Sequence, residues 1–199
     1  MAAQMEFGAL VLAGGRGSRM GCVEKPLLPF RGETLLARLD RELSFLPERL
    51  LSTNHPALAR GTGFVPVADR APGRGPLEGI AAALSVCRGE GLLVVPCDMP
   101  FFSRALGEYL LSFRDRGWDA WVCRAADGLH PLCGVYRKSC LPALQDCLDR
   151  GRLRVRLALE AAGGQVLDMA GSPFPPEVFS NINTPDDLAA LGEPPKGTE

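Results

Sequence analysis

The sequence predicts an α/β fold with three layers, in which a mostly parallel, doubly wound sheet is covered by helices on both faces. The first observation behind this prediction is that short apolar runs alternate along the chain with segments of helical periodicity. Such alternation is typical of parallel strands joined by crossover helices. The second is the length of 199 residues, which suits one domain, expected over residues 1–191. Residues 192–199 are polar and rich in proline and glycine, so we expect a disordered tail there.

The expected strands are short runs rich in apolar residues. Residues 7–12 and 92–96 contain no charged residue, which favours burial on both faces of the sheet. The full set of expected strands is 7–12, 49–53, 63–67, 92–96, 120–124, 131–136, 165–168 and 179–182.

The expected helices are recognised by leucine spacing and by their caps. In residues 34–46, leucines recur at helical spacing, and Pro47 ends the helix. Ser103 and Thr184 suit N-cap positions, and Pro185 suits a first helical position. The full set of expected helices is 34–46, 77–87, 103–116, 141–150, 154–161 and one that begins after Thr184.

Composition excludes several function classes. The formal net charge of −1 gives no global basic field, so we expect no nucleic-acid partner. The 7 cysteines are odd in number and scattered, which argues against a disulfide framework and fits a reducing cytoplasm. No targeting segment is recognised, and no apolar run approaches the ~18–20 residues that span a bilayer. We therefore expect a cytoplasmic protein with no membrane partner.

The loop after the first expected strand, residues 12–21 (LAGGRGSRMG), has the most distinctive composition in the chain. Its four glycines let the backbone approach a ligand closely, and exposed N–H groups in such a loop form a concave anion site. Arg16, Arg19 and Lys25 add fixed positive charge beside that site. The pattern predicts a cradle for a diphosphate or triphosphate, and a glycine-rich surface turn is the alternative.

Two other phosphate-binding motifs fail on spacing. A P-loop needs a lysine followed by serine or threonine after its second glycine, and this loop has no such pair. The dinucleotide fingerprint needs a last glycine where this chain has Met20, and a helix that starts within the loop. Pro26 and Pro29 argue against a helix directly after it.

Polar residues follow the next expected strands, where ligands of parallel sheets bind. Asn54 could hydrogen-bond a base or ribose, or form an Asx turn. The carboxylate of Asp69 could accept from a guanine edge or a ribose. Asp98 leaves a fully apolar strand and needs a partner, for which Mg²⁺ fits; a turn cap is the alternative. His130 is interpreted as a binding or structural residue, because a phosphate nucleophile is largely dianionic at pH 7 and needs no base.

Three further patterns each allow a binding and a structural interpretation. Gly75 and Gly79 share one face of a helix start, which lets a nucleotide or another element lie close. Asn181 and Asn183 are expected on the same side of a strand end, as ligand contacts or as caps. A run of alternating arginines could hold an anionic acceptor or form a solvated turn: Arg150, Arg152, Arg154 and Arg156.

These motifs, in this order, resemble those of the molybdenum cofactor guanylyltransferase family. The similar segments are the glycine loop with Lys25-Pro26-Leu27-Leu28, Gly75-Pro76-Leu77-x-Gly79, Pro96-Cys97-Asp98-x-Pro100, His130-Pro131, Arg154-Val155, and Asn181-x-Asn183-Thr184-Pro185. The resemblance covers residues 7 to about 190. The chain departs from the family at Gly17-Ser18 and at Glu24, where bulkier or basic residues and an aspartate are common.

The resemblance implies a Rossmann-like nucleotidyltransferase fold and transfer of GMP from GTP to the terminal phosphate of molybdenum-molybdopterin, with release of pyrophosphate. It implies Mg²⁺ as the metal, held by Asp98, and catalytic roles for Lys25, Arg19 and Asp98. Other molybdenum cofactor enzymes are further expected partners. The implied nucleotide and acceptor contacts are Leu12, Ala13, Gly14, Gly15, Lys25, Asn54, Asp69, Gly75, Gly79, Asp98, Arg154, Arg156, Asn181 and Asn183.

Two alternative functions stay open at this point. One is a related nucleotidyltransferase that uses CTP or another nucleotide, on a molybdopterin or on a sugar or polyol phosphate. The form Leu12-Ala13-Gly14-Gly15 resembles the guanine-type loop rather than the cytidine type. The other is a non-catalytic regulator that binds a nucleotide, which the presence of both Lys25 and Asp98 disfavours.

Overall fold

A seven-stranded sheet forms the centre of the computed structural model, which describes residues 7–13 and 24–192. The strand order is β5-β4-β1-β6-β8-β7-β9. The strands are β1 Gly8–Leu12, β4 Arg49–Ser52, β5 Val65–Val67, β6 Gly91–Pro96, β7 Ala120–Ala125, β8 Gly128–Arg137 and β9 Gln165–Asp168. A separate two-stranded hairpin pairs β2 Pro29–Phe30 with β3 Glu33–Thr34.

The sheet is mostly parallel. β1 pairs in parallel with both β4 and β6, β4 with β5, and β7 with β9. Only β8 among these seven strands runs the other way, antiparallel to β6 and to β7. The other strands therefore end at one common edge, which is where ligands bind in open α/β sheets.

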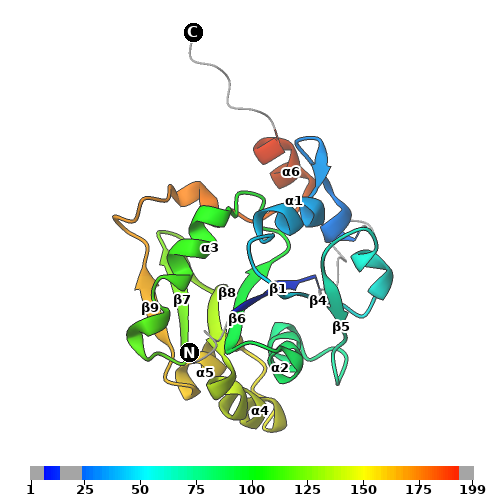
Figure 1. Ribbon diagram of the computed structural model, residues 1–199. Helices are drawn as coiled ribbons and strands as arrows, with labels where there is room; N and C mark the ends of the chain where they lie inside the picture. The colour runs from blue at the N-terminus through cyan, green and yellow to red at the C-terminus, as the bar shows by residue number, and fades with distance from the viewer. Residues whose placement is uncertain (1–6, 14–23, 193–199) are drawn as a thin grey trace.

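Helices cover both faces of the sheet (Figure 1). The helices are α1 Leu35–Glu42, α2 Pro76–Val86, α3 Arg104–Leu111, α4 Leu141–Asp149, α5 Val155–Ala161 and α6 Pro185–Gly192. Single 3-10 turns lie at Lys25–Leu27, Pro56–Ala59, Arg114–Arg116, Lys138–Cys140 and Pro176–Phe179. The fold class predicted from the sequence is confirmed.

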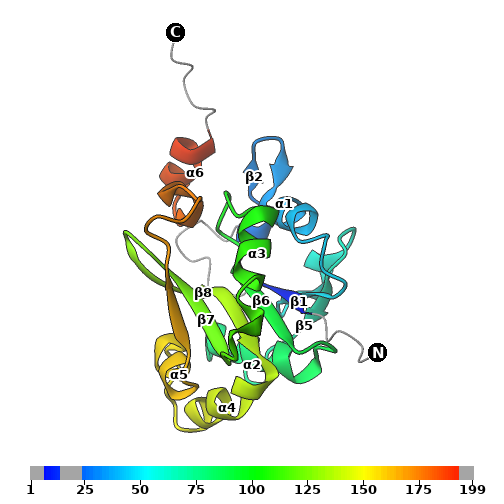
Figure 2. The same ribbon diagram turned by 60° about the vertical axis from the view of Figure 1, so that its left-hand side comes forward.

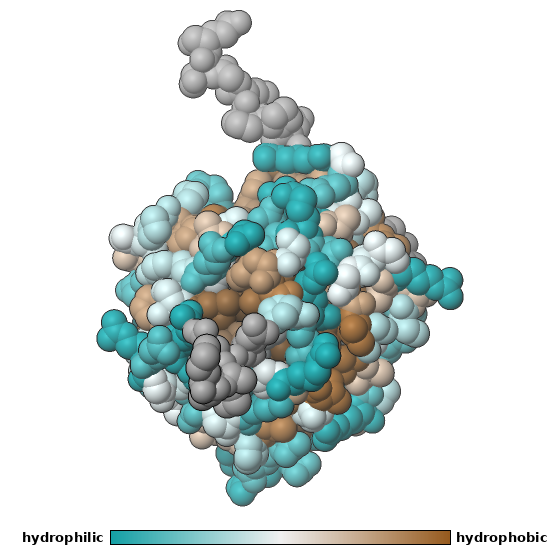
Figure 3. Space-filling model, in the orientation of Figure 1, coloured by the Kyte–Doolittle hydropathy of each residue, from teal (hydrophilic) through white to brown (hydrophobic). Residues whose placement is uncertain are grey.

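Alternation along the strands divides the core into two layers. Ala9 and Val11 of β1 pack with α1 and α3, whereas Leu10 and Leu12 pack with α2, α4 and α5. Successive side chains of a strand point to opposite faces, so a strand buried on both faces is apolar throughout. On the face shown in Figure 3, hydrophilic residues cover most of the surface and hydrophobic ones form smaller patches near its middle, as expected when two helical layers enclose the core.

The predicted caps are confirmed. Ser103 Oγ accepts a hydrogen bond from the Leu106 N–H at 3.3 Å, and Thr184 Oγ1 accepts one from the Asp187 N–H at 3.1 Å. Both satisfy N–H groups that have no partner within the helix. The predicted 192–199 tail begins at the last residue of α6, and residues 193–199 lie outside the described residues.

Several predicted bounds are wrong for local reasons. α1 ends at Glu42 rather than at residue 46, and the helix expected over 103–116 stops at Leu111 before a separate 3-10 turn. There the Ser112 hydroxyl donates to the Tyr109 carbonyl at 2.6 Å, and such bonds compete with helix continuation. β8 is longer than residues 131–136 because it forms a tight hairpin with β7.

The strand predicted over residues 179–182 is also wrong. Its first residue ends the 3-10 turn Pro176–Phe179 instead. Pro176 lacks an N–H donor for a ladder and suits the first turn of a helix. The 3-10 turn at Lys25–Leu27 has the same origin, since Pro26 fits its start, although no α-helix forms there.

The six cysteines in the described part of the chain are buried and unbridged: Cys87, Cys97, Cys123, Cys133, Cys140 and Cys147. Burial raises the pKa of the Cys97 and Cys140 thiols to about 12. Among the described residues, no helix combines the length and the hydrophobicity needed to cross a bilayer.

Candidate functional site

The segments that leave β1, β4, β5 and β6 begin side by side at one edge of the sheet. The Ala13 N–H donates to the Ser52 carbonyl at 3.1 Å, and the Cys97 N–H donates to the Leu12 carbonyl at 3.1 Å. The Thr53 N–H donates to the Val67 carbonyl at 2.9 Å. Residues that directly follow these four strands are therefore brought together, as the parallel arrangement predicts.

Lys25, Asp98 and Asn183 form a cluster at this edge, which we call the reactive cluster. Lys25 Nζ lies 2.9 Å from Asp98 Oδ2 and donates to Asn183 Oδ1, also at 2.9 Å. The side chains of Lys25 and Asp98 are 24% and 19% exposed. The ion pair is thus partly shielded from water and still open to a ligand. Partial shielding from water strengthens the interaction of the Lys25 ammonium with an incoming anion.

Neighbouring backbone groups fix the position of this cluster. The Ile182 N–H donates to the Asp98 carbonyl at 2.9 Å and so attaches the segment before α6 to the end of β6. Asp187 Oδ2 accepts from the N–H groups of Asn183 and Thr184 at 2.9 and 2.8 Å, completing a reciprocal cap with Thr184. Hydrogen bonds from the Asn183 N–H and the Thr184 hydroxyl lower the pKa of Asp187, so this cap stays charged at neutral pH.

Asn54 and Asp69 form a second pair, at the ends of β4 and β5. Asn54 Nδ2 donates to Asp69 Oδ2 at 3.1 Å, and the Asp69 N–H donates to Asn54 Oδ1 at 3.1 Å. Each side chain orients the other. The pair presents a fixed carboxylate and amide on the β5-β4-β1 half of the sheet, which suits the polar edge of a nucleobase or a ribose.

The two candidate glycines have different local roles. Gly75 has φ +75° and ψ −167°, a conformation that is strained for any residue with a Cβ, and it precedes Pro76 at the start of α2. Gly79 is buried, and a Cβ there would lie 2.3 Å from Ser52 Oγ. Gly79 therefore allows α2 to pack closely on β4, the structural interpretation that the sequence left open.

Three candidate residues do not join the reactive cluster by a hydrogen bond within the described ranges 7–13 and 24–192. Arg154 is exposed at the N-cap of α5, and Arg156 pairs with Glu160 at 3.3 Å. Asn181 Nδ2 donates to the Phe179 carbonyl at 3.2 Å, so the two asparagines have different partners. The common strand end expected for them does not exist. The candidates Gly14, Gly15 and Arg19 lie outside the described residues.

The structure adds two ion pairs that sequence reasoning missed. Glu24, the residue before Lys25, lies 3.3 Å from His55 Nδ1. Arg74 Nη1 lies 3.5 Å from Glu78 Oε2, and Arg74 Nη2 donates to the Leu148 carbonyl at the end of α4. The i,i+4 spacing of Arg74 and Glu78 could have indicated the second pair. No local sequence signal indicates the contact between Arg74 and α4.

Glu78 gives a stability prediction. Glu78 is 2% exposed, and its Oε2 has no hydrogen-bond partner among the described residues. Of these residues, Arg74 is the one whose positive charge compensates the Glu78 carboxylate. We expect Arg74→Met to lower the free energy of unfolding by about 3 kcal/mol, because it leaves a buried carboxylate unpaired. Urea unfolding measures this. In the Glu78→Gln background the same change should cost clearly less, and equal costs in both backgrounds would contradict the pairing.

Asp98 offers a fitting ligand for a divalent metal, although no described group of three or more His, Cys, Asp or Glu residues could form a protein cage for one. Mg²⁺ is commonly held by one or two carboxylates, with phosphate oxygens and waters as its other ligands. Asp98 already faces a cation, the Lys25 ammonium, at 2.9 Å. A single carboxylate therefore fits a metal whose other ligands are phosphate oxygens and waters.

Comparisons with known proteins show which proteins the chain resembles. A family model described as "MobA-like NTP transferase domain" matches residues 9–165. A molybdenum cofactor guanylyltransferase of Pseudomonas putida is 36% identical over 186 residues, which cover 90% of this chain and 94% of that protein.

Solved structures extend the comparison. Molybdopterin-guanine dinucleotide biosynthesis protein A from Archaeoglobus fulgidus matches with a TM-score of 0.79 and 26% identity, over 94% of this chain and 97% of that one. A Mycobacterium tuberculosis protein solved as a manganese complex has a TM-score of 0.62 and 23% identity, over 94% and 98% of the two chains. The second likeness concerns the fold alone.

Proposed function

Because the chain belongs to the family of MobA-like NTP transferases, we propose that it transfers GMP from GTP to the terminal phosphate of molybdenum-bound molybdopterin and releases pyrophosphate. The observation that carries this proposal is the reactive cluster, in which Lys25 and Asp98 meet at the sheet edge next to the end of β1. Relatives that share about a third of their residues with this chain are named for this activity. We also propose a cytoplasmic enzyme whose acceptor is supplied by other enzymes of the cofactor pathway.

The proposed mechanism relies on positioning and on charge. The acceptor phosphate is largely dianionic at neutral pH, since its second pKa is about 6, so it can attack the α-phosphate without a general base. Lys25 would exchange its contact with Asp98 for the α-phosphate and stabilise the charge that develops there. Arg19 and the backbone of the glycine loop, including Gly14 and Gly15, would hold the leaving β- and γ-phosphates.

Asp98 and the Asn54–Asp69 pair would have separate roles in holding the metal and the nucleotide. Asp98 would hold a divalent metal, which we propose to be Mg²⁺; when bound, it supplies neutralisation of phosphate charge. Leu12 and Ala13 would border the nucleotide where β1 ends. Asn54 and Asp69 would contact the base or ribose, and the carboxylate of Asp69 suits the two N–H donors of a guanine edge.

A nucleotide panel tests the proposal. We expect GTP with Mg²⁺ to raise the melting temperature more than ATP or CTP does at equal concentration, because stabilisation follows affinity and reaches about 2.7 kcal/mol at a hundredfold excess over Kd. We expect Asp69→Asn to reduce the preference for GTP, and the control Asp115→Asn, on an exposed side chain, to leave it unchanged.

Three outcomes of this panel, taken together with an assay of pyrophosphate release, have distinct meanings. A preference for CTP would overturn the guanine assignment and keep the reaction class. Pyrophosphate release that requires both GTP and molybdopterin supports the enzyme. GTP binding without any pyrophosphate release would show a nucleotide-binding regulator instead.

A further inference from the structure

A third hydrophobic cluster lies apart from the two layers that cover the sheet, and we call it the satellite cluster. β2, which contributes to it, and α6, which packs against it, lie at the same end of the molecule (Figure 2). Its buried members and the half-buried side chains packed against them are Leu28, Phe30, Leu35, Ile182, Phe101, Leu188 and Leu191. These residues come from three segments that are far apart in the sequence, so the tertiary fold alone brings them together.

Each of these three segments also carries one member of the reactive cluster. In the first segment, Leu28 follows Lys25 by three residues, and in the second, Phe101 follows Asp98 by three residues. In the third, Ile182 directly precedes the asparagine of the reactive cluster, and its N–H donates to the Asp98 carbonyl at 2.9 Å. The two clusters are therefore connected at three points by short stretches of chain, each at most ~11 Å long.

The segment that carries Lys25 is packed through the satellite cluster. Within residues 24–34, Leu28 and Phe30 are the side chains that join a hydrophobic cluster, and both join this one. The Phe30 ring is 1% exposed and meets the Phe101 ring edge to face, with centroids 5.6 Å apart and planes at 81°. Aromatic pairs in this arrangement are more favourable than burial of the same area alone. The contact between the two rings therefore holds the chain that carries Lys25 against the segment that follows β6.

Arg31 covers the satellite cluster from the outside. Its guanidinium carbon lies 5.2 Å from the centroids of both phenyl rings, Phe30 and Phe101, and its Nη2 donates to the Leu191 carbonyl of α6 at 3.4 Å. Arg31 and Gly32 form the two-residue turn between β2 and β3, with φ of +49° and +89°. Such tight hairpins need positive φ at both positions, but a residue with a Cβ rarely adopts it and does so where its surroundings fix it. The hairpin is therefore held in one position against α6.

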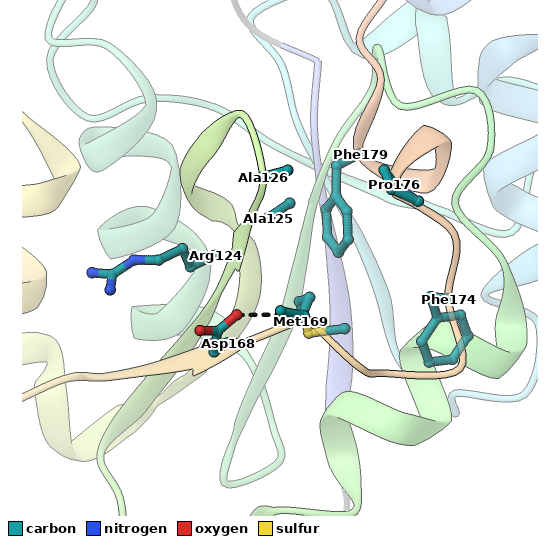
Figure 4. A pocket seen from close by; sticks show the side chains of 9 residues that line it. Arg124, Ala125, Ala126, Asp168, Met169, Phe174, Pro176 and Phe179 are labelled. Carbon is teal, nitrogen blue, oxygen red and sulfur yellow. Dashed lines mark hydrogen bonds between the residues drawn. The ribbon is translucent and has the colours of Figure 1, made fainter.

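The segment before α6 is anchored at both of its ends. Phe179 belongs to the core layer on the α1 and α3 face and lines a pocket of about 230 Å³ whose other walls are mostly apolar (Figure 4). Its ring packs against the His130 imidazole, with centroids 5.0 Å apart. His130 Nε2 in turn lies 2.8 Å from Asp127 Oδ1, so His130 has a structural role. Ile182 is fully buried in the satellite cluster, which therefore completes the positioning of the next residue, Asn183.

From these observations we propose that the satellite cluster positions the reactive cluster for catalysis, and that Phe101 is a positioning residue. This inference rests on the proposed function. Phe101 acts through Lys25 and Asp98, because their 2.9 Å contact depends on how their two segments pack. A misplacement of about 1 Å by a change outside the reacting groups can lower a rate by about 100-fold. The Asn54–Asp69 pair lies on another part of the sheet edge, so the affinity for the nucleotide should be largely kept.

The test removes one ring from the satellite cluster and, as a matched control, one ring from the opposite edge of the sheet. Phe101→Ala is compared with Phe113→Ala, a second half-buried phenylalanine, whose ring meets Tyr109 edge to face at 5.3 Å and stacks on Trp118. Trp118 precedes the start of β7, which runs in the same direction as β6 and so begins at the edge opposite to the reactive cluster. Phe101→Leu is the conservative variant, since it keeps a large apolar side chain.

Two measurements follow Lys25, one without turnover and one with it. The chain has three lysines, Lys25, Lys138 and Lys196, so labelling with 13C-lysine gives three Cε signals by NMR, which are assigned by replacing one lysine at a time. The Lys25 signal reports the position of the ammonium between Asp98 and Asn183 in the absence of substrate. Pyrophosphate release with GTP and molybdopterin gives kcat and the KM for GTP.

We expect Phe101→Ala to move the Lys25 signal toward that of free lysine and to lower kcat at least about tenfold, with the KM for GTP changed less than about threefold. Phe101→Leu should restore most of both. Phe113→Ala should lower the melting temperature but leave the Lys25 signal and kcat unchanged. Arg31→Ala, at an exposed side chain over both rings, repeats the test without removing a buried atom and should move the signal in the same direction.

The outcomes separate this inference from the proposed function. An unmoved Lys25 signal in Phe101→Ala, or an equal movement in Phe113→Ala, would overturn the positioning role. A loss confined to the KM for GTP would overturn it as well, because misplaced reactive groups lower kcat. A signal that moves in Phe101→Ala alone, in a protein that releases no pyrophosphate, would support the positioning and overturn only the proposed function.

Discussion

Replacing Lys25 by alanine is expected to lower kcat for pyrophosphate release by at least ~100-fold, the usual effect of removing one preorganised charge from a transition state. The ammonium is the described cation nearest to Asp98 and is positioned by two side chains, Asp98 and Asn183, each at 2.9 Å. Its charge is needed most when the α-phosphate passes through its transition state, so kcat should fall more than the affinity for GTP. Lys25→Arg should restore little, because a planar guanidinium cannot take the position of a compact ammonium between two acceptors.

The same variant should fold normally. The Lys25–Asp98 pair is partly exposed, so its loss changes stability only modestly. Circular dichroism melting checks this, and Lys138→Ala, on an exposed lysine, is the matched control. If Lys25→Ala kept turnover within threefold of the unaltered protein, the catalytic role of Lys25 would be refuted.

The sheet edge and most of the reactive cluster could be predicted from the sequence. Residues 7–12 and 92–96 are apolar enough to be recognised as buried parallel strands, and the residues after such strands share an edge by geometry alone. This rule placed Asp98 at the same edge as the glycine loop and the Lys25 that follows it, and the 2.9 Å contact between Lys25 and Asp98 confirms their proximity. The strand alternation likewise predicted the helical layers on both faces.

Contacts between distant side chains could not be predicted in the same way. The Arg74 contact with the Leu148 carbonyl depends on how α2 packs against α4, which periodicity does not specify. The segment 179–182 has the composition of a short strand, but whether it pairs depends on a free neighbour in the sheet. The Ser180 N–H donates to the Glu177 carbonyl within the 3-10 turn, and the Ile182 N–H donates to the Asp98 carbonyl, so the segment joins no strand of the sheet. The pocket beside Phe179 depends on the same tertiary arrangement.

Asp98→Asn is expected to lower kcat at physiological Mg²⁺ by at least ~100-fold and to raise the Mg²⁺ concentration needed for half-maximal activity. The amide has the size of the carboxylate and its oxygen can still accept from Lys25, so the cluster geometry is kept while the anionic metal ligand is lost. The change also removes the charge that neutralises Lys25 in the absence of nucleotide. GTP without metal should therefore stabilise Asp98→Asn at least as much as it stabilises the unaltered protein.

Asp98→Asn is thus expected to weaken the effect of GTP when Mg²⁺ is present and not to weaken it when metal is absent. This difference separates a metal-binding role of Asp98 from a purely structural one. A structural carboxylate would weaken GTP binding with and without metal, because loss of the cap or turn would disturb the whole edge. Loss of a metal ligand weakens GTP binding only when the metal is present. The measurement is the shift in melting temperature caused by GTP, with Mg²⁺ and with a chelator, and Asp115→Asn is the control on an exposed carboxylate. Equal losses under both conditions would show that Asp98 caps the turn after β6, and the metal would then need another ligand.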